Sequence, residues 1–131
     1  YERHDYYSPD RSSGTLLCHY RHHGNTDPLY LPGMQDITAH VDFTAVAEAA
    51  DSAGLRVAGY TSQAAFLLGC GIEQMLEAMA SGQDAEWFAL IEGFKRLVLP
   101  TEMGERFRVM ALARGLQGDP EGFGQDMRFR L

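Results

Sequence analysis

The sequence is poor in basic residues and in long apolar runs, and each shortage excludes a class of protein. Lysine and arginine number 11 against 18 aspartate and glutamate residues, which gives a formal net charge of -7. A nucleic-acid binder needs a basic patch or stripe, so we expect no nucleic-acid partner. Apolar runs stay far below the roughly 18 residues of a membrane-spanning helix, so we expect no membrane contact.

Cysteine is also scarce, since the chain has only Cys18 and Cys70, both in apolar surroundings. They lack the spacing of a metal or redox motif, and we expect two buried free thiols in a reducing compartment. His19, His22 and His23 raise the question of a metal site. On a strand, however, His19 and His23 point to one side and His22 to the other, which is poor chelating geometry. We therefore expect no metal site.

The 131 residues present amount to one domain with an α/β pattern. Alternating or continuous apolar residues predict strands at 15–22, 55–60 and 107–114. Apolar residues at helical spacing predict a helix over 43–53 and a series of helices within 63–98. A right-handed crossover would make the first two strands parallel. The first strand should lie fully inside a sheet.

Turn-forming residues mark the loops. Residues 1–13 and 24–41 are expected to be loops, and the second is long enough to suggest a function. The segment 116–131 is rich in Gly, Asp and Gln, and we expect a loosely ordered tail after a domain over 1–115.

Two features of the predicted helices are best explained by structural roles. Asp42 is a good N-cap for the helix that follows, and Gly54 is placed to end it. Met75 and Met79 continue an apolar stripe with Ile72, which we expect to fill the core instead of forming a groove for a partner.

Three strands with these helices leave apolar strand surface without a covering layer. The pattern is therefore that of the second part of an α/β domain, and a start at Tyr1 within loop-like sequence suggests a longer protein. The outer edge of strand 15–22 would then be bare, and we expect the chain to self-associate through it.

Four sequence motifs occur in order between residue 1 and about residue 115. They are Gly14-Thr15-Leu16 with Tyr20-Arg21-His22, Gln35-Asp36-Ile37-Thr38-Ala39-His40-Val41-Asp42-Phe43, Gly59-Tyr60-Thr61-Ser62-Gln63-Ala64-Ala65-Phe66-Leu67, and Met103-Gly104-Glu105-Arg106-Phe107. Together they resemble the C-terminal part of the MidA family of S-adenosylmethionine-dependent methyltransferases, which are found in bacteria and mitochondria. The nine-residue motif that begins at Gln35 is the specific one.

The resemblance implies a class I methyltransferase fold, a seven-stranded Rossmann-like sheet whose last strand is antiparallel. Residues 15–22, 55–60 and 107–114 would be strands five, six and seven, with strand seven between the other two. Residues 63–98 would be a helical insertion. The resemblance also implies the cofactor S-adenosyl-L-methionine and a protein substrate with a target arginine. The family's cofactor loop has no counterpart in these residues, so we expect the chain alone to be inactive.

The mitochondrial branch of the family assembles complex I. A bacterial member would be cytoplasmic, and a eukaryotic member would lie in the mitochondrial matrix. The alternative function is a non-catalytic module that binds a partner protein or assists the assembly of a complex.

If the assignment holds, loops 1–13, 24–42, 61–63 and 101–106 meet at the carboxyl end of the sheet, where open α/β sheets bind ligands. The candidate catalytic residues are His40, Asp36 and Asp42. A histidine can act as general base near neutral pH, and carboxylates can bind a guanidinium in bidentate fashion. The candidate substrate-binding residues are Tyr6, Tyr7, Gln35, Thr38, Gln63, Glu102, Glu105 and Arg106.

Each candidate also has a structural interpretation. Asp42 is favoured as a helix cap, while Asp36 and His40 could fix the loop by hydrogen bonds. Gln63 could cap its helix, and Tyr6 and Tyr7 could cover apolar surface. Glu105 and Arg106 could pair with each other or with loop 24–42.

Overall fold

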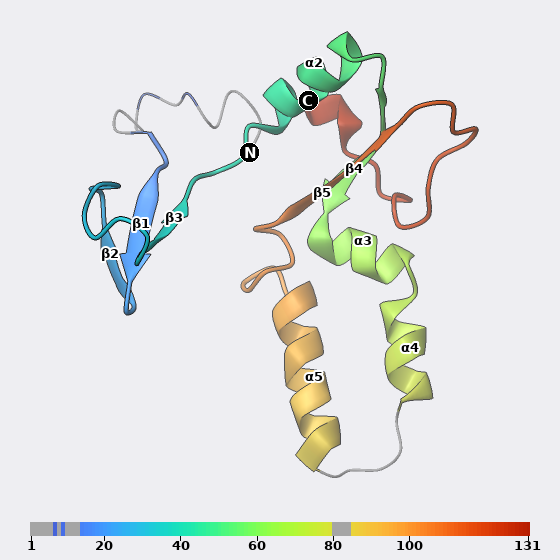
Figure 1. The fold of residues 1–131 in the computed structure, drawn as a ribbon. Coiled ribbons are helices and arrows are strands. Elements are labelled where there is room, and N and C mark those ends of the chain that lie inside the picture. Colours follow the sequence, from blue (N-terminus) through green and yellow to red (C-terminus); the bar gives the residue numbers. More distant parts are fainter. Residues whose placement is uncertain (1–6, 8, 10–13, 80–84) are drawn as a thin grey trace. The chain divides into compact units, whose positions relative to one another are not determined.

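The structure, a computed structural model, describes residues 7, 9, 14–79 and 85–131 (Figure 1). The chain forms two compact units, Tyr1–Val46 and Ala47–Leu131. Each unit contains one antiparallel sheet, and the helices follow from residue 43 onward. The α/β class predicted from the sequence is confirmed.

The first unit is built on a three-stranded sheet in the order β2-β1-β3. Strand β1 (Leu17–Tyr20) lies between β2 (His23–Asn25) and β3 (Asp36–Thr38) and is antiparallel to both. The turn from β1 to β2 consists of Arg21 and His22, whose φ angles are 47° and 66°. Positive φ at both central residues is the mark of a two-residue hairpin turn that follows the twist of the strands.

This sheet bears on the predicted position of residues 15–22. They do form a strand inside a sheet, whose neighbours in the first unit are β2 and β3; its place as strand five beside residues 107–114 stays a prediction. The segment 24–41, expected to be a loop, supplies part of β2 and all of β3. The edge on which we based self-association is therefore covered, and self-association itself stays a prediction.

Helix α2 (Phe43–Ser52) begins and ends as its sequence predicts. The carboxylate of Asp42 accepts a hydrogen bond of 2.9 Å from the backbone N–H of Ala45, which is N-cap geometry. Gly54 has a φ of 71°, and the backbone N–H of Leu55 donates to the carbonyl of Ala50 over 2.8 Å. A left-handed glycine with such a bond is a common helix ending.

The second unit is organised around strands β4 (Arg56–Ser62) and β5 (Arg108–Ala113), which pair in antiparallel register from Arg56–Ala113 to Ser62–Arg108. The register shifts between Val57 and Gly59. Tyr60 and Thr61 of β4 are fully buried, so β4 lies at the centre of the core. The prediction that the last strand is antiparallel is confirmed.

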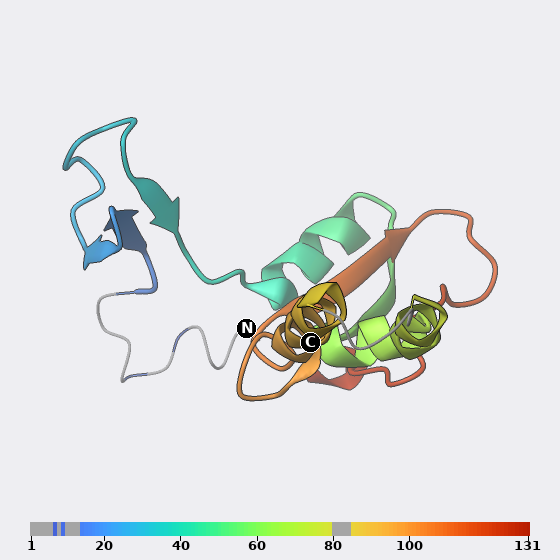
Figure 2. The same ribbon diagram turned by 90° about the horizontal axis from the view of Figure 1, so that it is seen from below.

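Three helices connect these strands: α3 (Gln63–Gly69), α4 (Ile72–Ala78) and α5 (Ala85–Val98). Ser62 caps α3 by accepting a hydrogen bond from the N–H of Ala65 over 3.3 Å. Gly71, with a φ of 80°, separates α3 from α4, and α5 ends two residues before Pro100. Figure 2 views α4 and α5 almost along their axes, side by side.

The segment 116–131 is not a loosely ordered tail, and that prediction is wrong. The backbone N–H of Met127 donates to the carbonyl of Tyr60 over 2.7 Å, and the ring of Phe123 packs 5.3 Å from the ring of Phe66. The segment ends in a short 3-10 helix, Arg128–Arg130. It is ordered because it binds main-chain groups of β4 and buries Phe123, which a reading of its polar composition does not reveal.

Two further expectations about burial are wrong. Cys18 is buried as predicted, but Cys70 is exposed. Met75 and Met79 were expected in the core, yet 64% and 59% of their surfaces are exposed. The reason is that α4 and α5 leave a space between them that no described residue fills.

Candidate functional site

The motif that begins at Gln35 forms β3 and the segment after it. Asp36 lies directly opposite His19 of β1, and Thr38 lies opposite Leu17. Because opposite residues of an antiparallel pair project to the same side, and alternate residues share a face, Asp36, Thr38 and His19 are on one face of this sheet. The sequence did not single out His19 as a partner of Asp36, since the register of the two strands could not be foreseen.

Hydrogen bonds fix this motif to the Gly14-Thr15-Leu16 motif and the strand that follows it. The hydroxyl of Thr38 donates to the carbonyl of Leu17 over 3.0 Å. The backbone N–H of His40 donates to the hydroxyl oxygen of Thr15 over 3.1 Å. Asp36, Thr38 and His40 are all exposed, so a substrate could reach their side chains.

Gln35 has a structural task in this loop. Its amide oxygen accepts a hydrogen bond of 3.0 Å from Asn25, and its amide nitrogen donates over 3.0 Å to the carbonyl of Asp27. Both ends of the amide are therefore occupied within the loop. This arrangement favours a role in shaping the segment between β2 and β3, and the predicted contact with substrate stays a prediction.

The Asp42 carboxylate holds the start of α2, so the structural interpretation of this residue is confirmed. The bond uses one carboxylate oxygen, Oδ1, and leaves Oδ2 for a second partner. A catalytic task of Asp42 is therefore compatible with the cap but is a separate prediction.

In the second unit the motif around Gln63 contacts the turn at 101–106. The side-chain amide of Gln63 donates to the carbonyl of Leu97 over 2.9 Å, and its backbone N–H donates to the carbonyl of Phe107 over 3.0 Å. The N–H of Ala64 donates to the carbonyl of Gly104 over 3.0 Å. Gly104 is buried against Val98, which leaves no room for a β-carbon. These two motifs, at least 36 residues apart in the chain, are therefore neighbours.

The charged residues of this turn were expected to bind substrate, or, for Glu105 and Arg106, to pair with each other or with loop 24–42. Glu105 does not pair with Arg106; its carboxylate and its carbonyl both accept hydrogen bonds from Arg108, over 3.4 Å and 2.8 Å. Arg106 and Glu102 are exposed, and neither side chain makes a hydrogen bond or ion pair to any residue that the structure describes. Both are thus available to a substrate or to another part of the protein.

The remaining candidates are the two tyrosines. Tyr7 is 70% exposed. Tyr6 lies outside the described residues, as does most of loop 1–13. Because the motifs fall into two units, a single rim that unites all four of them stays a prediction.

One cluster of charged side chains was missed in the sequence. Arg128 contacts Asp126 over 2.7 Å and Asp119 over 3.4 Å, and Arg56 also contacts Asp119 over 3.4 Å. Burial raises the pKa of Asp126, but the hydrogen bonds and charge of Arg128 outweigh it and hold that pKa below its usual value. The available signal was the placement of Asp119 and Asp126 within ten residues of Arg128. The cluster ties the end of the chain to β4.

Neither a metal site nor a membrane-spanning helix is found in the part of the chain that the structure describes. Among the described residues, no three His, Cys, Asp or Glu side chains gather in a way that could hold a metal ion. None of the described helices has the length and apolar character needed to span a membrane.

Comparison with known proteins agrees with this geometry. Residues 1–61 match a family model described as "Putative S-adenosyl-L-methionine-dependent methyltransferase". The whole chain superposes, with a TM-score of 0.92 and 42% identity, on 34% of a "likely methyl transferase" from Burkholderia thailandensis solved with S-adenosyl-homocysteine bound.

Curated relatives include the mitochondrial protein arginine methyltransferase NDUFAF7 of Rattus norvegicus, 35% identical over 112 residues, and that of Danio rerio, 30% identical over 107 residues. These alignments cover 82% and 81% of the chain but 25% of each relative, so the chain spans about a quarter of their length. The motifs, the family match over residues 1–61 and the fold thus agree that the chain is similar to the MidA-like family of S-adenosyl-L-methionine-dependent methyltransferases.

Proposed function

We propose that these residues form the substrate-side part of an S-adenosyl-L-methionine-dependent methyltransferase that modifies a protein arginine. The observation that carries the proposal is the match of the entire chain, at 42% identity, to a methyltransferase structure with S-adenosyl-homocysteine bound. The choice of arginine is supported by the names of the curated relatives. It also agrees with the exposed carboxylates that the motifs contain, because a carboxylate can bind a guanidinium.

A guanidinium is a planar cation with five N–H donors, and a carboxylate can accept two of them at once. Asp36 is exposed on β3, beside His19. Transfer of a methyl group to a guanidinium nitrogen requires that nitrogen to lose a proton, and a histidine or carboxylate nearby can accept it. We assign binding of the guanidinium to Asp36. We assign to His40 the role of the base that accepts the proton.

We propose that the described residues do not themselves form the cofactor site. In an open α/β sheet such a site lies at the carboxyl ends of neighbouring parallel strands. Both sheets described here are antiparallel, and no glycine-rich turn lies between parallel strands in them. We therefore expect other residues of the complete protein to hold S-adenosyl-L-methionine, and we assign no cofactor contact to the residues described here.

Titration calorimetry with S-adenosyl-homocysteine tests this division of labour. The protein expressed from its complete gene should bind the compound, and the isolated 131-residue chain should not. Absence of binding by the complete protein would contradict the proposed function. Tight binding by the isolated chain would mean that residues named here as substrate contacts hold the cofactor instead.

A further inference from the structure

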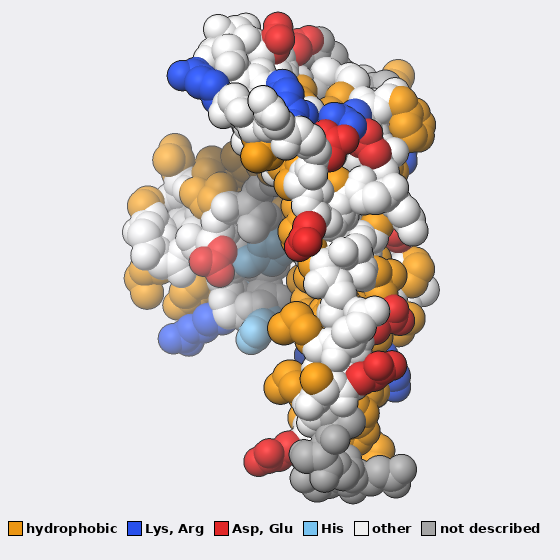
Figure 3. All heavy atoms as spheres, turned by 90° about the vertical axis from the view of Figure 1, so that its right-hand side faces the viewer, with side chains coloured by type: hydrophobic (Ala, Val, Ile, Leu, Met, Phe, Trp, Pro, Cys, Tyr) orange, Lys and Arg blue, Asp and Glu red, His pale blue; other side chains and the backbone are white. Residues whose placement is uncertain are grey.

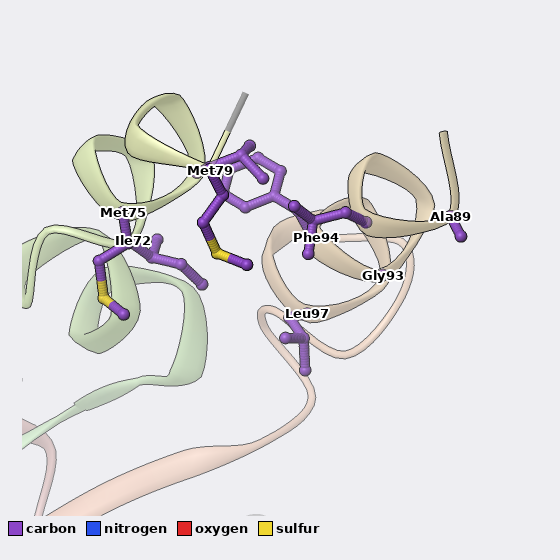
Figure 4. A pocket seen from close by; sticks show the side chains of 9 residues that line it. Ile72, Met75, Met79, Ala89, Gly93, Phe94 and Leu97 are labelled. Atoms are coloured by element: carbon purple, nitrogen blue, oxygen red, sulfur yellow. The ribbon is translucent and has the colours of Figure 1, made fainter. Parts of the chain in front are cut away.

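An apolar groove of about 290 Å³ lies between α4 and α5. Figure 4 shows Met79, the residue just after α4, and Phe94 of α5 pointing toward one another across it, with Gly93 on the α5 side. The walls further include Ile72 and Met75 from α4 and Leu97 from α5. The groove is therefore built almost entirely from carbon and sulfur.

Met75 and Met79 are large apolar side chains that nevertheless stay mostly exposed beside this groove. Burying apolar surface is worth roughly 25 cal/mol per Å², so two methionines left more than half exposed forgo stabilisation that tighter packing would give. A contiguous exposed apolar surface commonly marks a place where another molecule binds. Methionine is well suited to such a surface because its flexible, polarisable side chain adapts to different partners.

The charges around the groove indicate what it would accept. On α4 and the first half of α5, the charged side chains are Glu73, Glu77 and Glu86, all acidic. Glu86 stands four residues before Leu90, which lines the groove, so the two lie on the same side of α5. Figure 3, seen from the side of α4 that is turned away from α5, shows acidic and hydrophobic side chains interspersed over its lower part.

The basic residues of α5 lie at the opposite end of the helix. Lys95 and Arg96 are both in its last turn. Lys95 forms an ion pair of 2.8 Å with Glu92, and this pair lowers the pKa of Glu92. Glu86 thus places a negative charge at the end of the apolar groove where α5 begins.

We propose that this groove docks the protein substrate through a cationic amphipathic segment, a point that rests on the function proposed above. Apolar side chains of the segment would fill the space between Met79 and Phe94, and its Lys and Arg residues would lie near Glu73 and Glu86. Helical segments commonly bind in this way, with anchors at every third or fourth residue. The groove would select the substrate and hold it, while the reaction takes place elsewhere on the protein.

A labelled peptide of about 16 residues, with Leu at helical spacing and Lys or Arg between, is the probe. Its binding to the protein expressed from the complete gene is measured by fluorescence anisotropy. We expect it to bind at least roughly ten-fold more tightly than the same peptide with Glu in place of each cation, and more weakly as salt rises. Equal binding of the two peptides would overturn the proposal.

Gly93→Leu blocks the groove directly. A β-carbon at Gly93 meets no atom within 4 Å, and leucine favours a helix more than glycine does, so this variant should fold. We expect it to weaken binding of the cationic peptide about ten-fold or more. Ala78→Leu is the matched control, because Ala78 is exposed on α4 and does not line the groove. Unchanged binding by Gly93→Leu would overturn the proposal.

Charge reversal separates local attraction from net charge. Glu86→Lys together with Glu73→Lys should weaken binding of the cationic peptide by roughly three- to ten-fold. A matched double variant reverses Asp51 and Glu121 to Lys, since neither belongs to the groove helices and it changes the net charge equally. An equal loss in both variants would show attraction by the net charge alone and would overturn the assignment to this groove.

Two other occupants of the groove give distinct results. Dimerisation that Gly93→Leu abolishes, seen by sedimentation, would assign the groove to a second copy. No peptide binding by the complete protein would show that its own chain covers the groove. Either result overturns docking of substrate. Peptide binding requires no cofactor and no transfer, so bound peptide without any methyltransferase activity would contradict the proposed function while leaving the groove assignment intact.

Discussion

The hydroxyl of Thr61 donates a hydrogen bond of 2.6 Å to the carbonyl oxygen of Gln125, although 64 residues separate them. Thr61 is fully buried on β4, and Gln125 lies in the segment that follows β5. The bond therefore joins the central strand of the second unit to the end of the chain.

Replacing Thr61 by Val keeps the shape of the side chain but removes this donor. The carbonyl of Gln125 then loses its partner, and we expect the free energy of unfolding to fall by about 1–3 kcal/mol. Chemical denaturation measures the change. Thr61→Ser, which keeps the hydroxyl and loses one methyl group, should lose only about 1 kcal/mol. If Val were as stable as Thr at this position, the bond would contribute nothing to holding the segment.

The contact between Gly59 and Phe123 should appear in a double-mutant cycle. A β-carbon on Gly59 would overlap the ring of Phe123, so we expect Gly59→Ala to cost about 1–3 kcal/mol of stability. In a Phe123→Ala background the same change should cost at least about 1 kcal/mol less, because the ring is gone. Gly124→Ala is the control, since nothing lies within 4 Å of the added carbon. Identical costs in both backgrounds would refute the packing of Phe123 on β4.

The ion pair of Asp126 with Arg128 predicts an acid-dependent loss of stability. Because the pKa of Asp126 in the folded protein is below its ordinary value of 3.8, the pair stabilises the fold at pH values above 3.8. This stabilisation is lost as the pH falls through the lower pKa of the folded state. The difference in stability between wild type and Asp126→Asn should therefore be present at pH 7 and shrink below about pH 4. A difference that is independent of pH would exclude the ionised carboxylate as its cause.

Two variants of Asp42 separate its role as the N-cap of α2 from a role in catalysis. Asparagine is as good an N-cap as aspartate, whereas alanine is poor, so Asp42→Ala should cost about 1 kcal/mol and Asp42→Asn much less. If the carboxylate is also needed for catalysis, Asp42→Asn should lower kcat while stability is kept. If Asp42 only caps α2, this variant should retain full activity. Thermal unfolding and turnover measured on the same samples distinguish the two results.

The boundaries of α2 follow from local sequence. The N-cap at Asp42 and the helix end at Gly54 each depend on one residue and its immediate neighbours. The antiparallel last strand came from the family resemblance and agrees with the register of β4 and β5. These features could be predicted because few residues determine them.

The β1–β2 hairpin could not be predicted for a physical reason. Its turn places Arg21 and His22 at positive φ, where Asn-Gly or Asp-Gly is usual, so the strongest sequence signal for a hairpin is missing. Strand β3 then pairs with β1 across a gap of 15 residues from Tyr20 to Asp36, and this register follows from no local pattern.

The order of the last segment and the use of the site residues depend on contacts that are distant in sequence. Phe123 packs against Gly59 and Phe66, which a reading of its polar neighbours does not indicate. The hydrogen bonds of Gln35 to Asn25 and Asp27 show that this residue supports its loop, while its contact with substrate stays a prediction. The motifs thus supply the candidate residues, and the structure is needed to identify those that support the fold.

The most direct test is transfer of a labelled methyl group from S-adenosyl-L-methionine to an arginine-containing protein by the product of the complete gene. Wild type should label arginine, and Asp36→Asn and His40→Ala should each reduce kcat by about 10²–10⁴-fold while the affinity for S-adenosyl-homocysteine is unchanged. Thr44→Ser, just beyond the motif, should keep its activity. Full activity in both motif variants, or label on a residue other than arginine, would contradict the roles proposed for this site.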